Sequence, residues 1–307
     1  MKNKELRIVA GPCSVDESNL DQIYEISEIK VDKKRAVWGT RVVGLKSRTA
    51  LNKSGDGMGM DYDILMKNND KLLAGASADS FEIAPSMKLA EKIVRETDLL
   101  VATEVMMPHI QMPLLERVIS ANKLLAWSPS VNQLGWPLMQ TSQYAARNDW
   151  WLGIKNGKWI GIPVSDASEK NSDIMSPVER CWEGLSKYAQ NDKEKTVLIH
   201  RGFLAADRRD YRAMPIHELA ARVKKRSGLK LFFDPSHSYG PNLRDKIVDD
   251  VVKLLSRKFD DGEFLYDGIL IEVGDSITDT DQHISVDELR GLIEKLSEIR
   301  TLVGLEG

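Results

Sequence analysis

The stretch that decides the fold is residues 231–238, which read Leu-Phe-Phe-Asp-Pro-Ser-His-Ser. An apolar run that ends abruptly in polar residues is typical of a buried parallel strand with reactive groups at its carboxyl end. His237 lies where a metal ligand or an acid–base group would be exposed. A single histidine of this kind is more often a local hydrogen-bonding residue. Because several other apolar runs of the chain end in the same way, we interpret this end as part of a site.

Apolar runs alternate with amphipathic segments along the whole chain. The apolar runs have the length and composition of strands, and they cover residues 7–15, 36–46, 99–105, 124–128, 150–155, 196–201, 230–234 and 268–273. Segments with helical spacing cover residues 20–29, 86–97, 111–121, 136–146, 173–189, 216–226, 245–258 and 285–302. A long loop with several glycines, residues 47–80, follows the second strand, and we expect a short helix within it at residues 62–73.

The alternation of strand and helix predicts the fold class. It implies parallel strands joined by right-handed crossovers. Eight such units in 307 residues predict an α/β protein with a single (β/α)8 TIM barrel over residues 1–307, without a separate regulatory domain. The alternative is an open doubly wound sheet. It is disfavoured because no Gly-x-Gly-x-x-Gly turn follows the first strand.

The composition limits the cellular compartments and the classes of partner that we expect for this protein. The formal net charge of −3 and the scattered Lys and Arg residues give no reason to expect nucleic acid or an anionic membrane as a partner. Two cysteines, Cys13 and Cys181, lie far apart in the sequence and indicate a reducing compartment. The N-terminus lacks the apolar region of a signal peptide, and no apolar run is long enough to span a bilayer. We therefore expect a cytoplasmic protein.

Polar residues at the strand ends meet on one face if the barrel closes. Four of them form a mixed sulfur, nitrogen and oxygen set: Cys13, His237, Glu272 and Asp281. Such a set suits one divalent transition metal ion, Mn, Fe, Co or Zn, better than Mg or Ca. Taken singly, Cys13 is more often a small core residue, and each acid is more often a solvated loop residue. The metal reading is favoured because the first, seventh and eighth strands are neighbours in a closed barrel.

A second group at the strand ends is cationic. It comprises Arg41, Lys46, Arg48, Lys155 and Arg201. Arginine forks and lysine point charges are how proteins hold phosphate and carboxylate. The alternative is a set of exposed cations in surface ion pairs. Five cations at one barrel mouth favour a polyanionic substrate.

These motifs resemble the class I 3-deoxy-D-arabino-heptulosonate 7-phosphate (DAHP) synthase family. The most specific are Gly-Pro-Cys-Ser at 11–14, Arg41 with Lys-Ser-Arg-Thr at 46–49, Lys-Asn-Gly at 155–157 and Asp-Pro-Ser-His-Ser at 234–238. The resemblance implies a metal-dependent barrel that condenses phosphoenolpyruvate with erythrose 4-phosphate and releases inorganic phosphate. That reaction opens the shikimate pathway to the aromatic amino acids. We expect small phosphorylated molecules as partners, and a homodimer or homotetramer.

The resemblance also assigns roles to residues of this sequence. It implies Cys13, His237, Glu272 and Asp281 as metal ligands, with Asp279 as an alternative to Asp281. Phosphoenolpyruvate would be surrounded by Arg41, Lys46, Lys155 and Arg201. The aldose phosphate would be held by Arg48 and Thr49, and Glu104 would belong to the polar network. We take Lys155, Lys46 and His200 as the catalytic candidates, with Lys155 as the acid. His200 is not the family's residue at its position, and we expect it to be a second proton carrier or a support for Arg201 or a bound water.

Three departures from the family pattern keep other functions open. Ser47 stands where the family has proline, and His200 stands where it has glutamate. Residues 126–130, Ala-Trp-Ser-Pro-Ser, lack the arginine that the family supplies to the phosphate of phosphoenolpyruvate. One alternative is a related synthase with another acceptor, similar to 3-deoxy-octulosonate 8-phosphate synthase. The other is a catalytically silent paralogue that binds a phosphorylated ligand.

Overall fold

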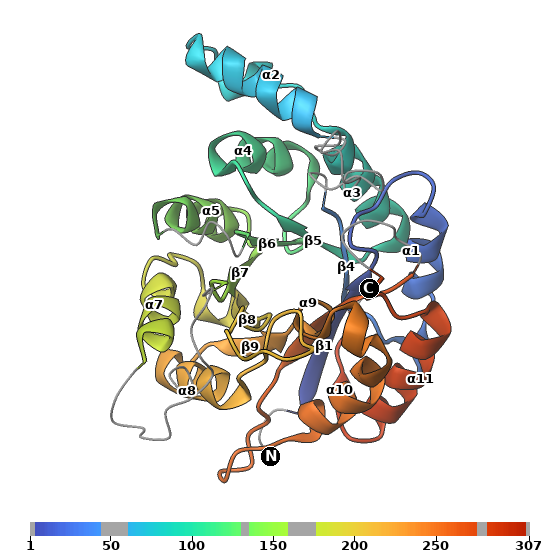
Figure 1. The fold of residues 1–307 in the computed structure, drawn as a ribbon. Coiled ribbons are helices and arrows are strands. Elements are labelled where there is room, and N and C mark those ends of the chain that lie inside the picture. The colour runs from blue at the N-terminus through green and yellow to red at the C-terminus, as the bar shows by residue number, and fades with distance from the viewer. Residues whose placement is uncertain (1–3, 44–60, 130–134, 159–175, 275–280, 305–307) are drawn as a thin grey trace.

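Eight parallel strands close into a barrel in the computed structural model. The structure describes residues 4–43, 61–129, 135–158, 176–274 and 281–304, and Figure 1 shows the helices arranged around the strands. In chain order the barrel strands are β1 (Glu5–Gly11), β4 (Gly39–Arg41), β5 (Leu100–Glu104), β6 (Leu124–Trp127), β7 (Trp151–Lys155), β8 (Thr196–His200), β9 (Lys230–Phe233) and β10 (Gly268–Glu272). Each strand pairs with the next, and β10 also pairs with β1 from Arg7–Gly268 to Gly11–Glu272. This closure confirms the predicted (β/α)8 barrel.

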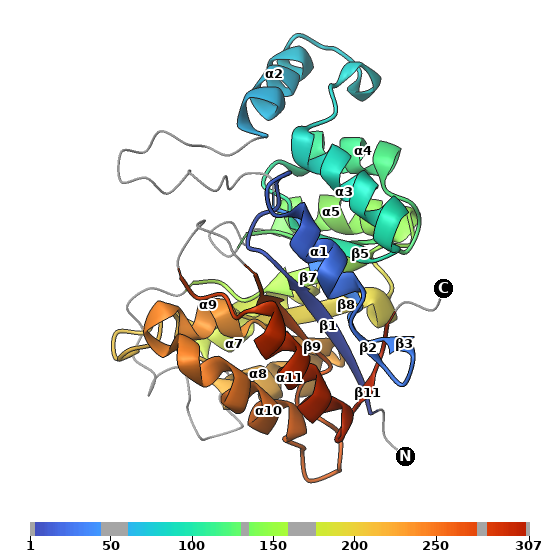
Figure 2. The same ribbon diagram turned by 90° about the vertical axis from the view of Figure 1, so that its right-hand side faces the viewer.

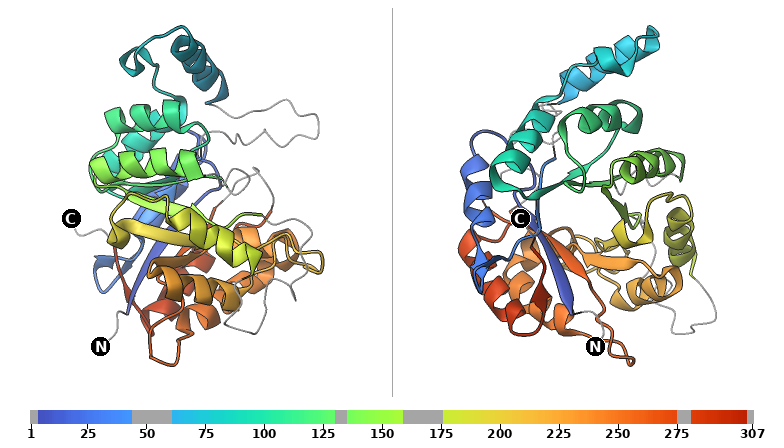
Figure 3. Two further views of the ribbon diagram at one scale, coloured as in Figure 1. Left: turned by 90° about the vertical axis from the view of Figure 1, so that its left-hand side faces the viewer. Right: turned by 180° about the vertical axis from the view of Figure 1, so that it is seen from behind.

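Helices form the outer layer around the strands. They are α1 (Leu20–Ser27), α3 (Pro85–Thr97), α4 (Pro108–Val118), α5 (Gly135–Arg147), α7 (Pro177–Ser186), α8 (His217–Ser227), α10 (Ile247–Ser256) and α11 (Val286–Ser297). The first and last of these, α1 and α11, lie side by side outside β1 and complete the ring (Figure 3). Serine and glutamate form capping boxes at the starts of α7 and α11, which explains where both helices begin.

A further helix, α2 (Tyr62–Leu73), stands outside the ring of helices, beyond α3 and α4 (Figure 2). Its bounds match the helix predicted within the long loop. Leu65 and Asn68 face the protein, and the Asn68 side chain exchanges hydrogen bonds with the backbone of Glu82. Leu73 at the far end is 79% exposed. In the part of the chain that is described, no helix is long and apolar enough to cross a membrane.

Several short elements differ from the sequence expectations. The segment predicted as the end of the last helix forms β11 (Thr301–Leu302), which pairs in parallel with β1. A two-residue turn with positive φ at Asp32 and Lys33 joins β2 (Lys30–Val31) to β3 (Lys34–Arg35). After β9 the chain forms α9 (Pro235–Tyr239) rather than a loop. Short 3-10 turns complete the description: η1 (Ala78–Ser80), η2 (Lys193–Lys195) and η3 (Pro241–Lys246).

Side chains alternate between two apolar layers, and this alternation decides which residues can reach the barrel interior. The inner layer is Val9, Trp38, Leu100, Ala102, Leu125, Trp127, Trp151, Val197, Ile199, Phe232 and Leu270. Residues between them in the sequence, such as Ile8, Val101 and Leu198, pack outward against the helices. At the strand ends, Glu104, Lys155 and Glu272 therefore share the inward register, whereas His200 shares the outward register of Leu198.

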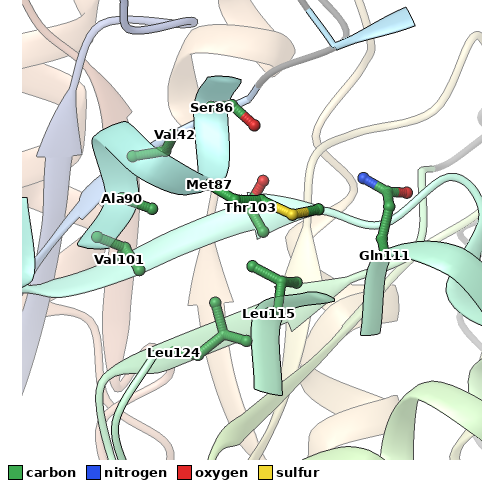
Figure 4. A pocket seen from close by; sticks show the side chains of 9 residues that line it. All are labelled: Val42, Ser86, Met87, Ala90, Val101, Thr103, Gln111, Leu115 and Leu124. Atoms are coloured by element: carbon green, nitrogen blue, oxygen red, sulfur yellow. The ribbon is translucent and has the colours of Figure 1, made fainter. Parts of the chain in front are cut away.

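One small cavity lies in the outer layer, between β5 and the helices α3 and α4 (Figure 4). Its lining is mostly apolar, with Met87, Val101 and Leu115 among its walls. Its volume is about 10 Å³, which is at most the room that one water molecule needs. It is far too small for a phosphorylated substrate. The carboxyl ends of the strands, where barrel enzymes carry their active sites, are the better candidate.

Candidate active site

A buried lysine occupies the end of β7. The Lys155 side chain is 1% exposed, and its Nζ donates a hydrogen bond to Glu104 Oε1 at 3.0 Å. The Nζ atom also lies 4.0 Å from Asp234 Oδ2 and 4.7 Å from the ring centroid of Trp127. Burial lowers the pKa of Lys155, and the carboxylates of Glu104 and Asp234 oppose that shift. The lowered pKa brings this ammonium closer to proton transfer near neutral pH.

An arginine and two further polar side chains lie at the ends of β4, β9 and β10. Arg41 Nη1 is 3.0 Å from Glu272 Oε1, and both side chains are buried. Burial disfavours the charged form of Arg41, but nearby acidic groups, first the Glu272 carboxylate, raise its pKa above the usual value. His237 Nε2 lies 3.7 Å from the same Glu272 oxygen. We name this set the mouth cluster: Arg41, Glu104, Lys155, Asp234, His237 and Glu272.

The short helix α9 orients His237 within the mouth cluster. The Asp234 carboxylate accepts a hydrogen bond from the His237 backbone N–H at 3.2 Å and so caps the helix. The same carboxylate lies 2.9 Å from His237 Nδ1. With the proton on Nδ1, the lone pair of Nε2 faces Glu272. Burial lowers the pKa of His237 well below its ordinary value, so the ring is neutral at pH 7.

The segment after β10 joins Cys13 to Glu272. Cys13 is fully buried after β1, and its backbone N–H donates to His283 Nε2 at 3.1 Å. His283 Nε2 lies 3.9 Å from Glu272 Oε2, and Gln282 Nε2 donates to that oxygen at 2.5 Å. The structure thus brings Cys13, His237 and Glu272 to adjacent strand ends. Asp281 is exposed, and within the described residues no hydrogen bond or ion pair joins it to this set, so its role as a ligand stays a prediction.

The donor chemistry at these strand ends fits a divalent transition metal in part. A thiol, a neutral imidazole and a carboxylate are the usual ligands of such ions. The 3.7 Å between His237 Nε2 and Glu272 Oε1 is a separation that two ligands of one ion can have. Within the described part of the chain, however, no group of three His, Cys, Asp or Glu side chains is arranged to hold an ion. The Arg41 guanidinium provides the positive charge beside Glu272.

The remaining predicted cations have different outcomes. Arg201 follows β8 and is 5% exposed; its backbone N–H donates to Asn156 Oδ1 at 2.8 Å. After burial, which is the main cause, its charge contributes to lowering the pKa of both Lys155 and His237. The other predicted binding residues, Lys46, Arg48 and Thr49, lie outside the residues that the structure describes, as does Asp279.

His200 lies in the layer between the barrel and the helices, not at the barrel mouth. Its Nδ1 is 2.9 Å from the Tyr266 hydroxyl, and its ring lies among Trp182, Phe203 and Phe233. Burial lowers the pKa of His200 well below its ordinary value. The expectation that His200 carries protons to the substrate disagrees with this placement, because the side chain has the outward register of β8.

Sequence reasoning did not assign roles to three residues around the mouth cluster. Trp127 fills the inward position at the end of β6, where its ring faces Lys155. The sequence offered a signal for Trp127, because this large aromatic residue lies in the stretch Ala-Trp-Ser-Pro-Ser at 126–130, where the family's arginine is missing. Gln282 and His283 follow Asp281 directly. No periodicity marks such loop residues, so their contacts become apparent only in the folded chain.

The fold gathers buried acids, two cations and His237 at the carboxyl ends of its strands, which is where barrel enzymes carry their active sites. A sequence model of the DAHP synthetase I family matches residues 2–303, and the chain belongs to this family. It is therefore an enzyme of the 3-deoxy-7-phosphoheptulonate synthase type, which joins phosphoenolpyruvate to an aldose phosphate in the shikimate pathway.

The barrel is also similar to a solved structure. The crystal structure of phospho-2-dehydro-3-deoxyheptonate aldolase (DAHP synthase) from Thermotoga maritima matches 96% of this chain and 69% of its own chain, with a TM-score of 0.65. The two sequences are 17% identical, so this likeness supports the fold alone. A comparison with curated proteins found no match.

Proposed function

We propose that this enzyme condenses phosphoenolpyruvate with erythrose 4-phosphate, with the help of one divalent metal ion, and releases inorganic phosphate. The observation that carries the proposal is the buried Lys155 beside Glu104, a few ångströms from the Asp234 carboxylate. A lysine that is desolvated and held by two acids at a strand end is suited to catalysis.

The proposed reaction forms and breaks bonds at particular atoms of the two substrates. Carbon 3 of phosphoenolpyruvate attacks the aldehyde carbon, and a carbon–carbon bond forms. Carbon 2 becomes electron-deficient, water adds to it, and its bond to the phosphate oxygen breaks to leave a ketone. The aldehyde oxygen takes up a proton, and Lys155 is the group whose lowered pKa suits it as the donor. Arg41 and Arg201 would hold the carboxylate and phosphate of the donor substrate.

The metal would be held by Cys13, His237 and Glu272. When bound, the ion would polarise the aldehyde oxygen as a Lewis acid. His237 is prepared for such a role because Asp234 holds its Nδ1 and leaves Nε2 toward Glu272. Arg41 would have to share the Glu272 carboxylate with the ion. Asp281 or Asp279 stays a proposed fourth ligand.

A silent, ligand-binding paralogue is the second candidate, and one observation favours it. Trp127 replaces the polar end of the fourth barrel strand, and the family's phosphate-binding arginine is absent from residues 126–130. The indole face stabilises the Lys155 ammonium, but it offers no guanidinium fork to a phosphate. A donor held less tightly, or a different acceptor, would follow from the same replacement.

Phosphate release tests these proposals directly. The purified protein would be loaded with Mn²⁺ and assayed with phosphoenolpyruvate and, in turn, with erythrose 4-phosphate, arabinose 5-phosphate and ribose 5-phosphate. We expect release with erythrose 4-phosphate that chelation abolishes and Mn²⁺ restores. Release only with a pentose phosphate would support the alternative acceptor. No release with any aldose, together with binding of phosphoenolpyruvate, would support the silent paralogue.

A further inference from the structure

The Gln282 side chain connects two charged residues, Arg212 from the segment between β8 and α8 and Glu272 from the end of β10. Its Nε2 donates to Glu272 Oε2 at 2.5 Å, and its Oε1 accepts from Arg212 Nη1 at 2.7 Å. Gln282 is fully buried, and so is Glu272. We propose that Gln282 is a positioning residue that fixes the orientation of the Glu272 carboxylate for the mouth cluster. This inference rests on the proposed function of that cluster.

Arg212 determines which end of the amide faces Glu272. A guanidinium can only donate hydrogen bonds, so it selects the carbonyl oxygen of Gln282. The NH₂ group is then directed at the carboxylate, which can only accept. Arg212 itself is fixed between elements, since its backbone N–H donates to the Tyr239 carbonyl at 3.3 Å after α9. The chain Arg212–Gln282–Glu272 therefore has one consistent direction of donation.

The consequence for Glu272 is that its two oxygens have different partners. Oε2 is held by Gln282, while Oε1 faces Arg41 Nη1 at 3.0 Å and His237 Nε2 at 3.7 Å. The terminal torsion of a glutamate is broad, so a directed hydrogen bond is needed to hold the carboxylate plane. A neutral amide does this without neutralising the carboxylate. Arg212 in direct contact would compete with Arg41 or a metal ion for the same charge.

The surrounding loop is anchored by contacts that do not use the Gln282 side chain. The Ile284 backbone N–H donates to the Glu272 carbonyl at 3.1 Å, and Gly274 donates to the Ile284 carbonyl at 2.9 Å. Arg244 Nε donates to the His283 carbonyl at 3.0 Å. Replacing the Gln282 amide should therefore change the orientation of Glu272 more than the path of the loop. Arg244 offers a matched control, because it contacts the backbone of the same loop but has no recorded contact with Glu272.

The test compares Gln282→Met, which keeps the side-chain length but loses both polar atoms, with Arg244→Met. Full-length wild type and variants would be titrated with Mn²⁺ by calorimetry and assayed for phosphate release. Loss of an outer hydrogen-bond partner of a ligand typically costs about 10–100-fold in metal affinity or activity. We expect that loss in Mn²⁺ affinity and in kcat for Gln282→Met, with the KM for phosphoenolpyruvate changed by less than about threefold. Arg244→Met should stay close to wild type in all three values.

A double variant adds a second readout. If the two residues act in one chain, Gln282→Met combined with Arg212→Met should be no worse than Gln282→Met alone. Wild-type Mn²⁺ affinity and kcat in Gln282→Met would overturn the inference, and so would equal losses in Arg244→Met. If the wild type binds Mn²⁺ but releases no phosphate, the proposed function fails while the Mn²⁺ titration still decides the role of Gln282. A wild type that binds no Mn²⁺ and releases no phosphate would overturn both.

Discussion

At the scale of single residues, the direction in which a side chain points decides whether Lys155 or His200 can serve as an acid–base group at the barrel mouth. Lys155 points into the barrel beside Glu104, whereas His200 points out of it toward Tyr266. The sequence could not distinguish the two directions. Parallel barrel strands are buried on both faces, so the residues before His200, Val-Leu-Ile at 197–199, show no alternation of apolar and polar positions. A shift of register by one residue turns every side chain to the other face.

The first prediction concerns His200 and the pH dependence of catalysis. His200→Gln retains a polar group that can reach Tyr266 but removes the titrating imidazole. We expect the kcat of this variant to follow pH as that of the wild type does between about pH 5.5 and 8, the range around the pKa of a free imidazole. Melting temperatures of both proteins serve as the control for folding. An acidic limb that is present in the wild type and missing in His200→Gln would contradict the assignment of His200 to the outer layer.

At the scale of elements, the hydrophobic pattern of the sequence predicted the long helices and the barrel strands, but it did not predict the short elements. The helix at Tyr62–Leu73 has its predicted bounds, because its apolar spacing is regular and Gly75, with a positive φ, follows its last turn. The hairpin of β2 and β3 has two residues per strand, which is too few for any periodicity. The second barrel strand is Gly39–Arg41, shorter than the predicted residues 36–46. The polar end of the stretch at 231–238 became α9 because Asp234 caps it.

The layer between β8, β10 and α8 leads to a second prediction, on stability against pH. The Tyr266 hydroxyl lies 2.7 Å from His217 Nδ1 and 2.9 Å from His200 Nδ1. Burial lowers the pKa of His217 to about 4. The unfolded chain, with a histidine pKa of about 6.5, therefore binds more protons than the folded chain between about pH 6.5 and 4. Stability is present above that window and is lost as the pH falls through it.

Urea unfolding at pH 7 and pH 5 measures this effect. For His217 alone, the shift corresponds to a loss on the order of 2 kcal/mol in the free energy of unfolding at pH 5. His217→Gln does not titrate, so its difference between the two pH values should be smaller than that of the wild type by about this amount. An equal difference in both proteins would show that His217 is not buried in its neutral form.

At the scale of the whole molecule, the sequence predicted the barrel and the gathering of polar residues at its strand ends, but not the contacts between those residues. Strict alternation of eight strands and helices is enough to predict closure, and closure brings the strand ends together. The pairing of Arg41 with Glu272, and of Gln282 with both Arg212 and Glu272, depends on side chains that are far apart in sequence. The single-domain chain, the cytoplasmic location, and the homodimeric or homotetrameric state stay predictions.

The central claim is that this barrel forms a carbon–carbon bond at the mouth cluster. The most direct measurement is carbon-13 NMR of phosphoenolpyruvate labelled at carbon 3, incubated with erythrose 4-phosphate, Mn²⁺ and the enzyme. We predict that the vinyl signal is replaced by that of an aliphatic methylene next to a new carbon–carbon bond, and that Lys155→Met slows this by at least about a hundredfold. Conversion of the label to the methyl group of pyruvate, or an equal rate in Lys155→Met, would contradict the account.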